Sequence, residues 1–223
     1  VNSQTLVSTY NFPGTTVYNG FCFITQINDT LRIGSSSNGK IYTVSKTGII
    51  RDSISTVFNF NNGLAYDGTG FWIARNASGT TSRIIKVNSA GNPVDTIRIT
   101  ALYGSSTIGI GGIAMDGPGH LWAAIYYSDF ASYPFAYAYK YDLATKNVVD
   151  SIPLRGKQVQ GITVKGDTIL YVTDNFQSDA ERIYGYRKAV GDTIFSFAAP
   201  DPDGDCDPRG LYWDGSSLWL MAY

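Results

Sequence analysis

The amino-acid sequence predicts an all-β protein, specifically a five-bladed β-propeller of four-stranded antiparallel blades. Segments that begin at Gly63, Gly112, Gly161 and Gly210 repeat at intervals of 49 residues, and each places a tight turn between two apolar stretches. The composition disfavours helices, because only one of the 18 acidic residues, Glu181, is a glutamate, whereas the chain holds 24 glycines and 16 tyrosines. A repeat of this length is typical of a closed ring of sheet units.

Each repeat contains the pattern of four short strands. Residues 63–72 show the first half, in which Asp67 and Gly68 form a tight turn between two apolar strands, the signature of a β-hairpin. A third strand and then a fourth strand, which carries an Asp-Ser/Thr-Ile sequence, complete the unit. The third strands are expected at residues 41–44, 84–87, 138–141 and 183–186, and the fourth strands near residues 52–54, 95–97, 150–152 and 192–194.

These units predict one domain over residues 1–223, with blades that start near residues 21, 63, 112, 161 and 210. The last unit reaches residue 223 at the end of its second strand, and residues 4–12 form a further strand before the first unit. We expect residues 4–12 to complete the last blade. That blade would still lack one strand, so it has three strands, or the natural chain continues, or another molecule donates the missing strand.

Each repeat unit contains Gly-apolar-x-apolar-Asp-Gly, then Leu-Trp, and later a strand of the Ile-Tyr-Lys-Val type. This pattern resembles the repeats of the NHL, YVTN and lactonase-like propellers, and the resemblance covers nearly the whole chain. The count of five units and the Asn61–Leu64 segment before an Asp-Gly hairpin are similar to the glutaminyl cyclotransferase branch. Where that family places an acidic residue before its Gly-Leu, this sequence has Asn61, Asn62, Gln160 and Arg209. The resemblance therefore implies a blade architecture rather than the cyclase reaction.

The overall charge and hydropathy exclude two classes of partner. A formal net charge of −1 and an isoelectric point near 5.7 argue against nucleic acid. No apolar run approaches the ~20 residues that a membrane span requires. The chain starts at Val1 without a charged and then apolar leader, and it is rich in Ser, Thr, Asn and Tyr. We therefore expect an extracellular or periplasmic protein whose leader has been removed.

A ligand site is expected on one face of the ring. The loops before each first strand, and those that join second to third strands, open on the same face, where loops on a rigid scaffold commonly bind ligands. Aromatic, amide, carboxylate and guanidinium groups together suit a polar glycan or peptide. The candidate ligand-binding residues are Asn61, Asn62, Arg75, Asn76, Tyr126, Tyr127, Asp129, Gln160, Asp174, Asn175 and Arg209.

A second candidate site is an acidic loop. Asp201, Asp203, Asp205 and Asp207 alternate along it, and carboxylates at this spacing repel one another unless they are solvated or neutralised. Calcium takes six to eight oxygen ligands, so the loop predicts a calcium site as the one cofactor of the protein. The alternative is a solvated acidic loop stiffened by its prolines.

The two cysteines are expected to meet. Cys22 lies in the first strand of the first blade and Cys206 directly before the fifth, and these blades are neighbours in a five-bladed ring. A disulfide between them would lock the ring and would imply an oxidising compartment. The alternative is two unrelated thiols.

The function that these features favour is a secreted, non-catalytic binding or assembly module. Its expected partners are a glycan, a peptide or other protein subunits, including copies of itself. One alternative is a structural subunit of an extracellular filament assembled through the terminal strands. Another is a cyclotransferase- or lactonase-like enzyme with its site at the mouth, for instance Asp174 with Arg75, and its signature would be a mouth carboxylate with a raised pKa. No catalytic residue is assigned, because His120 falls in a hairpin on the opposite face.

Overall fold

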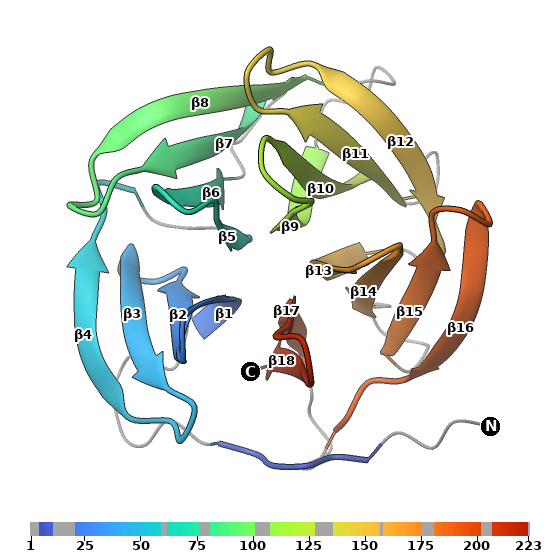
Figure 1. Ribbon diagram of the computed structural model, residues 1–223, viewed down its shortest axis with the longest axis horizontal. Coiled ribbons are helices and arrows are strands. Elements are labelled where there is room, and N and C mark those ends of the chain that lie inside the picture. Colours follow the sequence, from blue (N-terminus) through green and yellow to red (C-terminus); the bar gives the residue numbers. More distant parts are fainter. Residues whose placement is uncertain are drawn as a thin grey trace.

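The computed structural model of the 223-residue chain describes residues 5–10, 21–58, 62–75, 81–100, 108–127, 136–156, 158–174, 181–201 and 207–222. Eighteen strands and no helix occur in these ranges. Four antiparallel sheets have four strands each, in the order of the sequence from the inside of the ring outward (Figure 1). They match the repeat units that the sequence predicts.

The four complete blades and the remaining sheet have the following strands. Blade 1 contains β1 (Phe21–Ile27), β2 (Thr30–Ser35), β3 (Lys40–Ser45) and β4 (Ile50–Ser55). Blade 2 contains β5 (Leu64–Tyr66), β6 (Phe71–Arg75), β7 (Thr81–Val87) and β8 (Pro93–Thr100). Blade 3 contains β9 (Ile108–Met115), β10 (His120–Tyr127), β11 (Ala136–Asp142) and β12 (Val148–Leu154). Blade 4 contains β13 (Gln158–Lys165), β14 (Thr168–Asp174), β15 (Arg182–Arg187) and β16 (Asp192–Ala198). The remaining sheet contains β17 (Pro208–Trp213) and β18 (Leu218–Ala222).

The repeat glycines lie where the first strands approach one another around the axis. A Cβ atom added to Gly112 would lie 3.0 Å from the Cα atom of Gly161, and one added to Gly161 would lie 2.8 Å from the backbone nitrogen of Leu211. Likewise, a Cβ atom on Gly63 would lie 3.0 Å from the backbone nitrogen of Ile113. The 49-residue glycine period therefore has a physical cause, because only glycine lets neighbouring first strands pack this closely.

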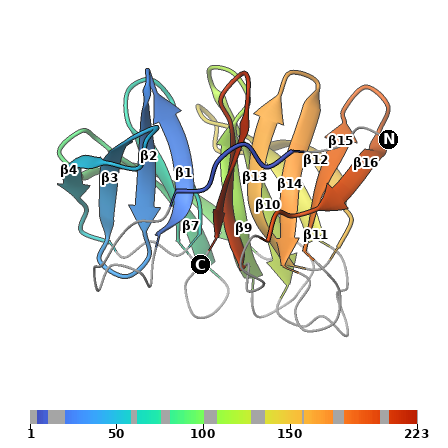
Figure 2. The same ribbon diagram turned by 90° about the horizontal axis from the view of Figure 1, so that it is seen from below.

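The hydrophobic core is divided among the interfaces between neighbouring sheets. The fully buried Trp72 packs with residues of blade 3, and the fully buried Trp122 packs with residues of blade 4. Two further clusters seat the β17–β18 sheet, one against Ile33 and its neighbours in blade 1 and one against Val172 and its neighbours in blade 4. Each sheet thus buries both faces against its neighbours, and the ring closes through side-chain packing on both sides of β17–β18 (Figures 1 and 2).

The structure confirms a β-propeller of four-stranded antiparallel blades but corrects their number. Over the described residues it contains four such blades, not five, and the fifth sector holds the two-stranded β17–β18 sheet. The expected closure by the N-terminal strand is also wrong for residues 5–10, which form no strand and are exposed. They run outside β18, near the ring perimeter (Figure 1), and Tyr10 reaches inward to stack on Trp219 with ring centroids 6.3 Å apart. Residues 4, 11 and 12 lie outside the described residues.

Within the described part of the chain, no helix is long and apolar enough to cross a membrane.

Candidate binding site at the mouth of the propeller

The candidate site is a polar cluster at one end of the fourth and fifth sectors. Asp174 ends β14 and pairs with Gln158 at the start of β13, so both lie at the same end of blade 4. Asp207 directly precedes β17, and Arg209 is the second residue of that strand. The ends of three strands therefore bring Gln160, Asp174, Asp207 and Arg209 together. Sequence reasoning had placed three of them in the ligand site and Asp207 in the calcium loop.

Arg209 is the centre of this cluster. Its Nη1 atom lies 3.5 Å from Oδ2 of Asp174, and its Nη2 atom donates to Oδ2 of Asp207. Nε2 of Gln160 donates a hydrogen bond of 3.4 Å to the same oxygen of Asp174. The side chains of Arg209 and Asp174 are largely buried, with 18% and 14% of their surface exposed, so these charges are poorly screened by solvent. One guanidinium thus bridges two carboxylates across the junction between blade 4 and β17.

Gln160 contributes an unused acceptor. Its side chain is 1% exposed, and in the described part of the chain its Oε1 atom has no hydrogen-bond partner. A β-bulge between Val159 and Gly161 places this residue out of the regular strand alternation. Because a buried polar atom without a partner costs free energy, such an atom in a polar cluster marks a position where an added donor would bind.

A small axial cavity lies beside the cluster. It is lined by residues from the first strand of every sheet, among them Phe23, Leu64, Ile113, Gln160 and Arg209. Its volume of about 10 Å³ is at the lower limit for one water molecule. This cavity therefore has room for about one water molecule, and the polar cluster beside it lies at the mouth end of blade 4.

The electrostatics of the cluster are dominated by carboxylates. Burial raises the pKa of Asp207 above its usual value, and the charges of Asp174 and Glu181 reinforce this effect, while Arg209 opposes it. Sequence reasoning missed Glu181 as a member of the site, although its being the only glutamate in the chain was a visible signal. Among the described residues, this cluster therefore combines one guanidinium, that of Arg209, with the carboxyl groups of Asp174 and Asp207 and the nearby charge of Glu181.

Other expected ligand residues lie apart from this cluster. The guanidinium of Arg75 lies over the ring of Phe58, 5.5 Å from its centroid, whereas Arg209 lies beside Asp174, which Arg75 was offered to accompany in the enzyme alternative. The Tyr126 ring packs over Gly109, the residue opposite it on β9. Asn62 and Tyr127 are placed by their backbones: the N–H group of Asn62 donates to the carbonyl oxygen of Ala74, and Tyr127 of β10 pairs with Ile108 of β9. Asn61, Asn76, Asp129 and Asn175 lie outside the described residues.

The calcium and disulfide predictions fall largely on residues that the structure does not describe. Asp203, Asp205 and Cys206 lie outside the described ranges, and Cys22 is placed only by its backbone in β1. Asp201 is exposed, whereas Asp207 is half-buried against Arg209. Among the described residues, no three His, Cys, Asp or Glu side chains form a group that could hold a metal ion. Both predictions therefore stay predictions.

Comparison with known proteins supports the fold class. No family model and no curated protein matches the sequence. The glutaminyl cyclase of Myxococcus xanthus is similar in structure, with a TM-score of 0.64 and 12% identity over 92% of this chain and 87% of that chain. Hydrazine synthase of Kuenenia stuttgartiensis gives a TM-score of 0.56 with 16% identity, and the WD40 propeller domain of Doa1 gives 0.56 with 9% identity. The aligned region includes 98% of this chain in the comparison with hydrazine synthase and 89% in the comparison with Doa1. It includes only 59% of each of those two chains. At such identities the likeness shows a β-propeller and no shared activity.

Proposed function

We propose that the protein is a non-catalytic binding module that holds a polar ligand at the mouth through Gln160, Asp174, Asp207 and Arg209. The observation that carries this proposal is the Oε1 atom of Gln160, which is buried without a partner beside the ion pairs of Arg209. A cluster that served only stability would be expected to satisfy this acceptor internally. An external donor would satisfy it instead.

The balance of groups defines the chemical class of the ligand. The carboxylates of Asp174, Asp207 and Glu181 and the Oε1 atom of Gln160 supply acceptors, while Arg209 is the one cation that the described residues bring into contact with Asp174 and Asp207. A ligand that adds a positive charge and several N–H donors complements this set. A peptide with a free amino group has both properties, so we propose a peptide rather than a glycan as the ligand.

The test is calorimetric titration of the protein with tripeptides that carry free amino termini and with the same tripeptides after N-acetylation. The proposal predicts that only the peptides with a free amino group bind, and that their affinity falls about tenfold or more in Asp174→Asn. Gln158→Leu on the adjacent strand β13 is the matched control, because Gln158 makes none of the ion pairs of the cluster, and it should bind like the wild type. Binding of neutral oligosaccharides without peptide binding would overturn the choice of a peptide.

A second candidate function is catalysis, and the raised pKa of Asp207 favours it specifically. Burial raises the pKa of Asp207, and this carboxyl group shares Arg209 with the Asp174 carboxylate, which is a paired-carboxyl arrangement of the kind that proton-transfer enzymes use. Mass spectrometry of the same tripeptides, including ones with N-terminal glutamine, would reveal loss of ammonia or water. Turnover that disappears in Asp207→Asn would support an enzyme, and unchanged peptides would exclude these reactions.

We also propose an extracellular or periplasmic location, supported by the polar, lysine-poor composition and by the two cysteines, whose blades are predicted to be neighbours in the ring. Mass spectrometry of the non-reduced protein tests the Cys22–Cys206 disulfide, and two free thiols would overturn it.

A calcium site at residues 201–207 predicts that the melting temperature of the protein falls on addition of EDTA, and an unchanged melting temperature would count against the site.

A further inference from the structure

We propose that the edge of β18 with which no described strand pairs binds an extended strand of another polypeptide, six or seven residues long, apolar on both faces and carrying a lysine opposite Trp219. This strand would take the position that the third strand occupies in the complete blades. This edge is distinct from the mouth cluster, so the tests of the two proposals are independent of each other.

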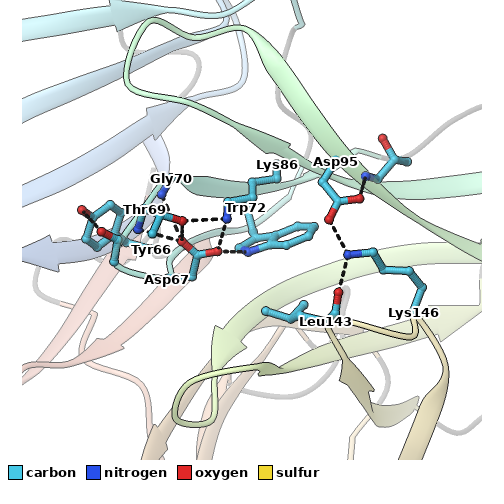
Figure 3. A network of polar contacts seen from close by, with 11 residues as sticks. Tyr66, Asp67, Thr69, Gly70, Trp72, Lys86, Asp95, Leu143 and Lys146 are labelled. Carbon is cyan, nitrogen blue, oxygen red and sulfur yellow. Dashed lines mark hydrogen bonds and ion pairs between the residues drawn. The ribbon is translucent and has the colours of Figure 1, made fainter.

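Blade 2 shows what a third strand contributes to its unit. Oδ2 of Asp67 accepts a hydrogen bond of 2.8 Å from Nε1 of Trp72 and lies 2.7 Å from Nζ of Lys86 (Figure 3). Lys86 belongs to the third strand β7, where it pairs directly with Trp72, and its Nζ atom lies 5.7 Å from the centroid of that ring. The lysine therefore neutralises the buried carboxylate and covers the indole at the same time.

Blade 3 repeats the arrangement and adds a second lysine. Nε1 of Trp122 donates to Oδ2 of Asp116 over 3.0 Å, and Lys140 of the third strand β11 pairs with Trp122 and lies 2.8 Å from the same oxygen. Nζ of Lys188, from the β15–β16 turn of the following blade, lies 3.2 Å from Oδ1 of Asp116. One aspartate thus accepts a lysine from its own third strand and another from the next blade.

The β17–β18 sheet has the same aspartate–tryptophan pair, but no third strand is paired with it in the described part of the chain. Nε1 of Trp219 donates to Oδ2 of Asp214 over 2.9 Å, and Lys46 from the β3–β4 turn of blade 1 lies 3.2 Å from the same carboxylate. Lys46 corresponds to Lys188, because both reach back from the following blade. Among the described residues, the place of Lys140 has no counterpart here, so the Asp214–Trp219 pair lacks the cation that a third strand would bring.

The exposure of the tryptophans agrees with a missing strand. Trp72 and Trp122 are 1% and 0% exposed, whereas Trp219 is only partly buried, although all three sit in equivalent hairpins. The other side chains of β18 are also only partly buried, from Leu218 to Met221, whereas β14 in blade 4 buries five consecutive residues. The edge of β18 thus retains apolar surface that the complete blades cover.

Apolar side chains flank this edge on both sides. On the blade 4 side, Phe197 of β16 packs in one cluster with Leu218 and Leu220 of β18, and the 42% exposed Phe195 stacks on Phe197 with centroids 6.2 Å apart. In contrast, the fourth strands of blades 2 and 3 bury Ile97 and Ile152 against a complete neighbouring blade. On the blade 1 side, the ring of Tyr10 stacks on Trp219. A strand between these walls must therefore be apolar on both faces.

These features define the occupant. The third strands of the complete blades have six or seven residues, which fixes the length of the segment. Register with Trp219 fixes the position of a lysine, whose charge complements Asp214. The exposed backbone groups of an edge strand supply the hydrogen bonds, as in other cases of strand addition.

The experiment uses a labelled synthetic peptide with the sequence of residues 81–88, which is the third strand of blade 2 and contains Lys86. Fluorescence anisotropy should show saturable binding to the protein. The same peptide with Lys86→Gln should bind about threefold more weakly at low salt, since a partly exposed ion pair and cation–π contact are lost. A scrambled peptide should not bind.

Two protein variants locate the binding surface. Phe195→Asp places a charge on the blade 4 wall and should weaken binding about tenfold or more. Val149→Asp is the matched control, because Val149 is an exposed apolar residue on the outer strand β12, and it should bind like the wild type. Thermal unfolding of both variants confirms that they are folded.

Three results would overturn the proposal. The scrambled peptide could bind as well as the matched one, Phe195→Asp could bind as well as Val149→Asp, or saturation could be absent up to the solubility limit. Light scattering tests the alternative occupant: a dimer of the protein that the peptide dissociates would assign the edge of β18 to a second copy instead of a foreign strand.

Discussion

Replacement of Gly161 by alanine tests whether the 49-residue glycine period reflects close packing of the first strands. The added Cβ atom would lie 2.8 Å from the backbone nitrogen of Leu211 and 3.0 Å from the carbonyl carbon of Gly210. Ordinary contacts of a Cβ atom start at 3.4 Å, so β17 would have to move away from β13 by about 0.6 Å. Both atoms belong to the backbone and cannot rotate aside.

The magnitude follows from two opposing effects. Overpacking against a rigid backbone costs about 3 kcal/mol of unfolding free energy. Alanine offsets about 0.5–1 kcal/mol of this cost, because it restricts the unfolded chain more than glycine does. The net loss is about 2 kcal/mol, which lowers the melting temperature by about 4–8 °C for a domain of this size.

Differential scanning calorimetry measures this effect, and Gly166→Asn is the matched control. Gly166 has a φ of +58° and open space around its Cα atom, and Asn28 occupies the corresponding hairpin turn of blade 1 with a φ of 52°. Asparagine tolerates this conformation, so the control should change the melting temperature little. Equal stability of Gly161→Ala and the wild type would refute the packing explanation of the repeat.

Three further predictions concern the carboxylates and the buried indole. Burial by itself would raise the pKa of Asp116, but hydrogen bonds from Lys140, Trp122 and Lys188 outweigh it and hold the pKa below its usual value. The wild type should therefore lose stability as the pH falls below about 4, and Asp116→Asn should be less stable at neutral pH but show a shallower acid decline in urea titrations. Asp207 behaves oppositely: its raised pKa stabilises the fold at low pH and the benefit is lost as the pH rises through the folded value, so Asp207→Asn should raise the melting temperature at pH 8. Trp122→Phe removes a fully buried indole that donates to Asp116 and should cost about 2–3 kcal/mol by chemical denaturation, and a cost below 1 kcal/mol would contradict the role given to this hydrogen bond.

The repeat could be found from the sequence because its signals are local. A turn such as that around Asp67 is specified by residues within six positions, with Oδ1 of Asp67 accepting from the backbone nitrogens of Thr69 and Gly70. Glycine spacing is equally visible, although its cause, the approach of Gly112 to Gly161, appears only in the assembled ring. The number of strands in the fifth sector was not predictable in this way, because it depends on whether residues 5–10 pair with β18.

The site was predicted in part for the same reason. Gln160, Asp174 and Arg209 lie at strand ends whose positions in the repeat are known, so topology alone places them at one mouth. The partner of Asp174 depends on side-chain reach across a blade junction, and the structure selects Arg209 in place of Arg75. Asp207 had been assigned to a calcium loop because its sequence neighbours are acidic, whereas its packing against Arg209 is a long-range outcome of where β17 docks.

The residue that precedes each repeat glycine differs from one sheet to the next, and in blade 2 it is Asn62. In blade 3 this position is Gly111, where a Cβ atom would lie 1.4 Å from the carbonyl oxygen of Val159, so no side chain fits. In blade 4 and in β17 the same position holds Gln160 and Arg209, which meet through Asp174. The blade repeat therefore supplies equivalent positions around the axis, and close packing at Gly111 excludes a side chain from one of them. Conversion of Gln160 to glycine should consequently abolish ligand binding at the mouth while leaving the ring intact, because blade 3 already folds with glycine at this position.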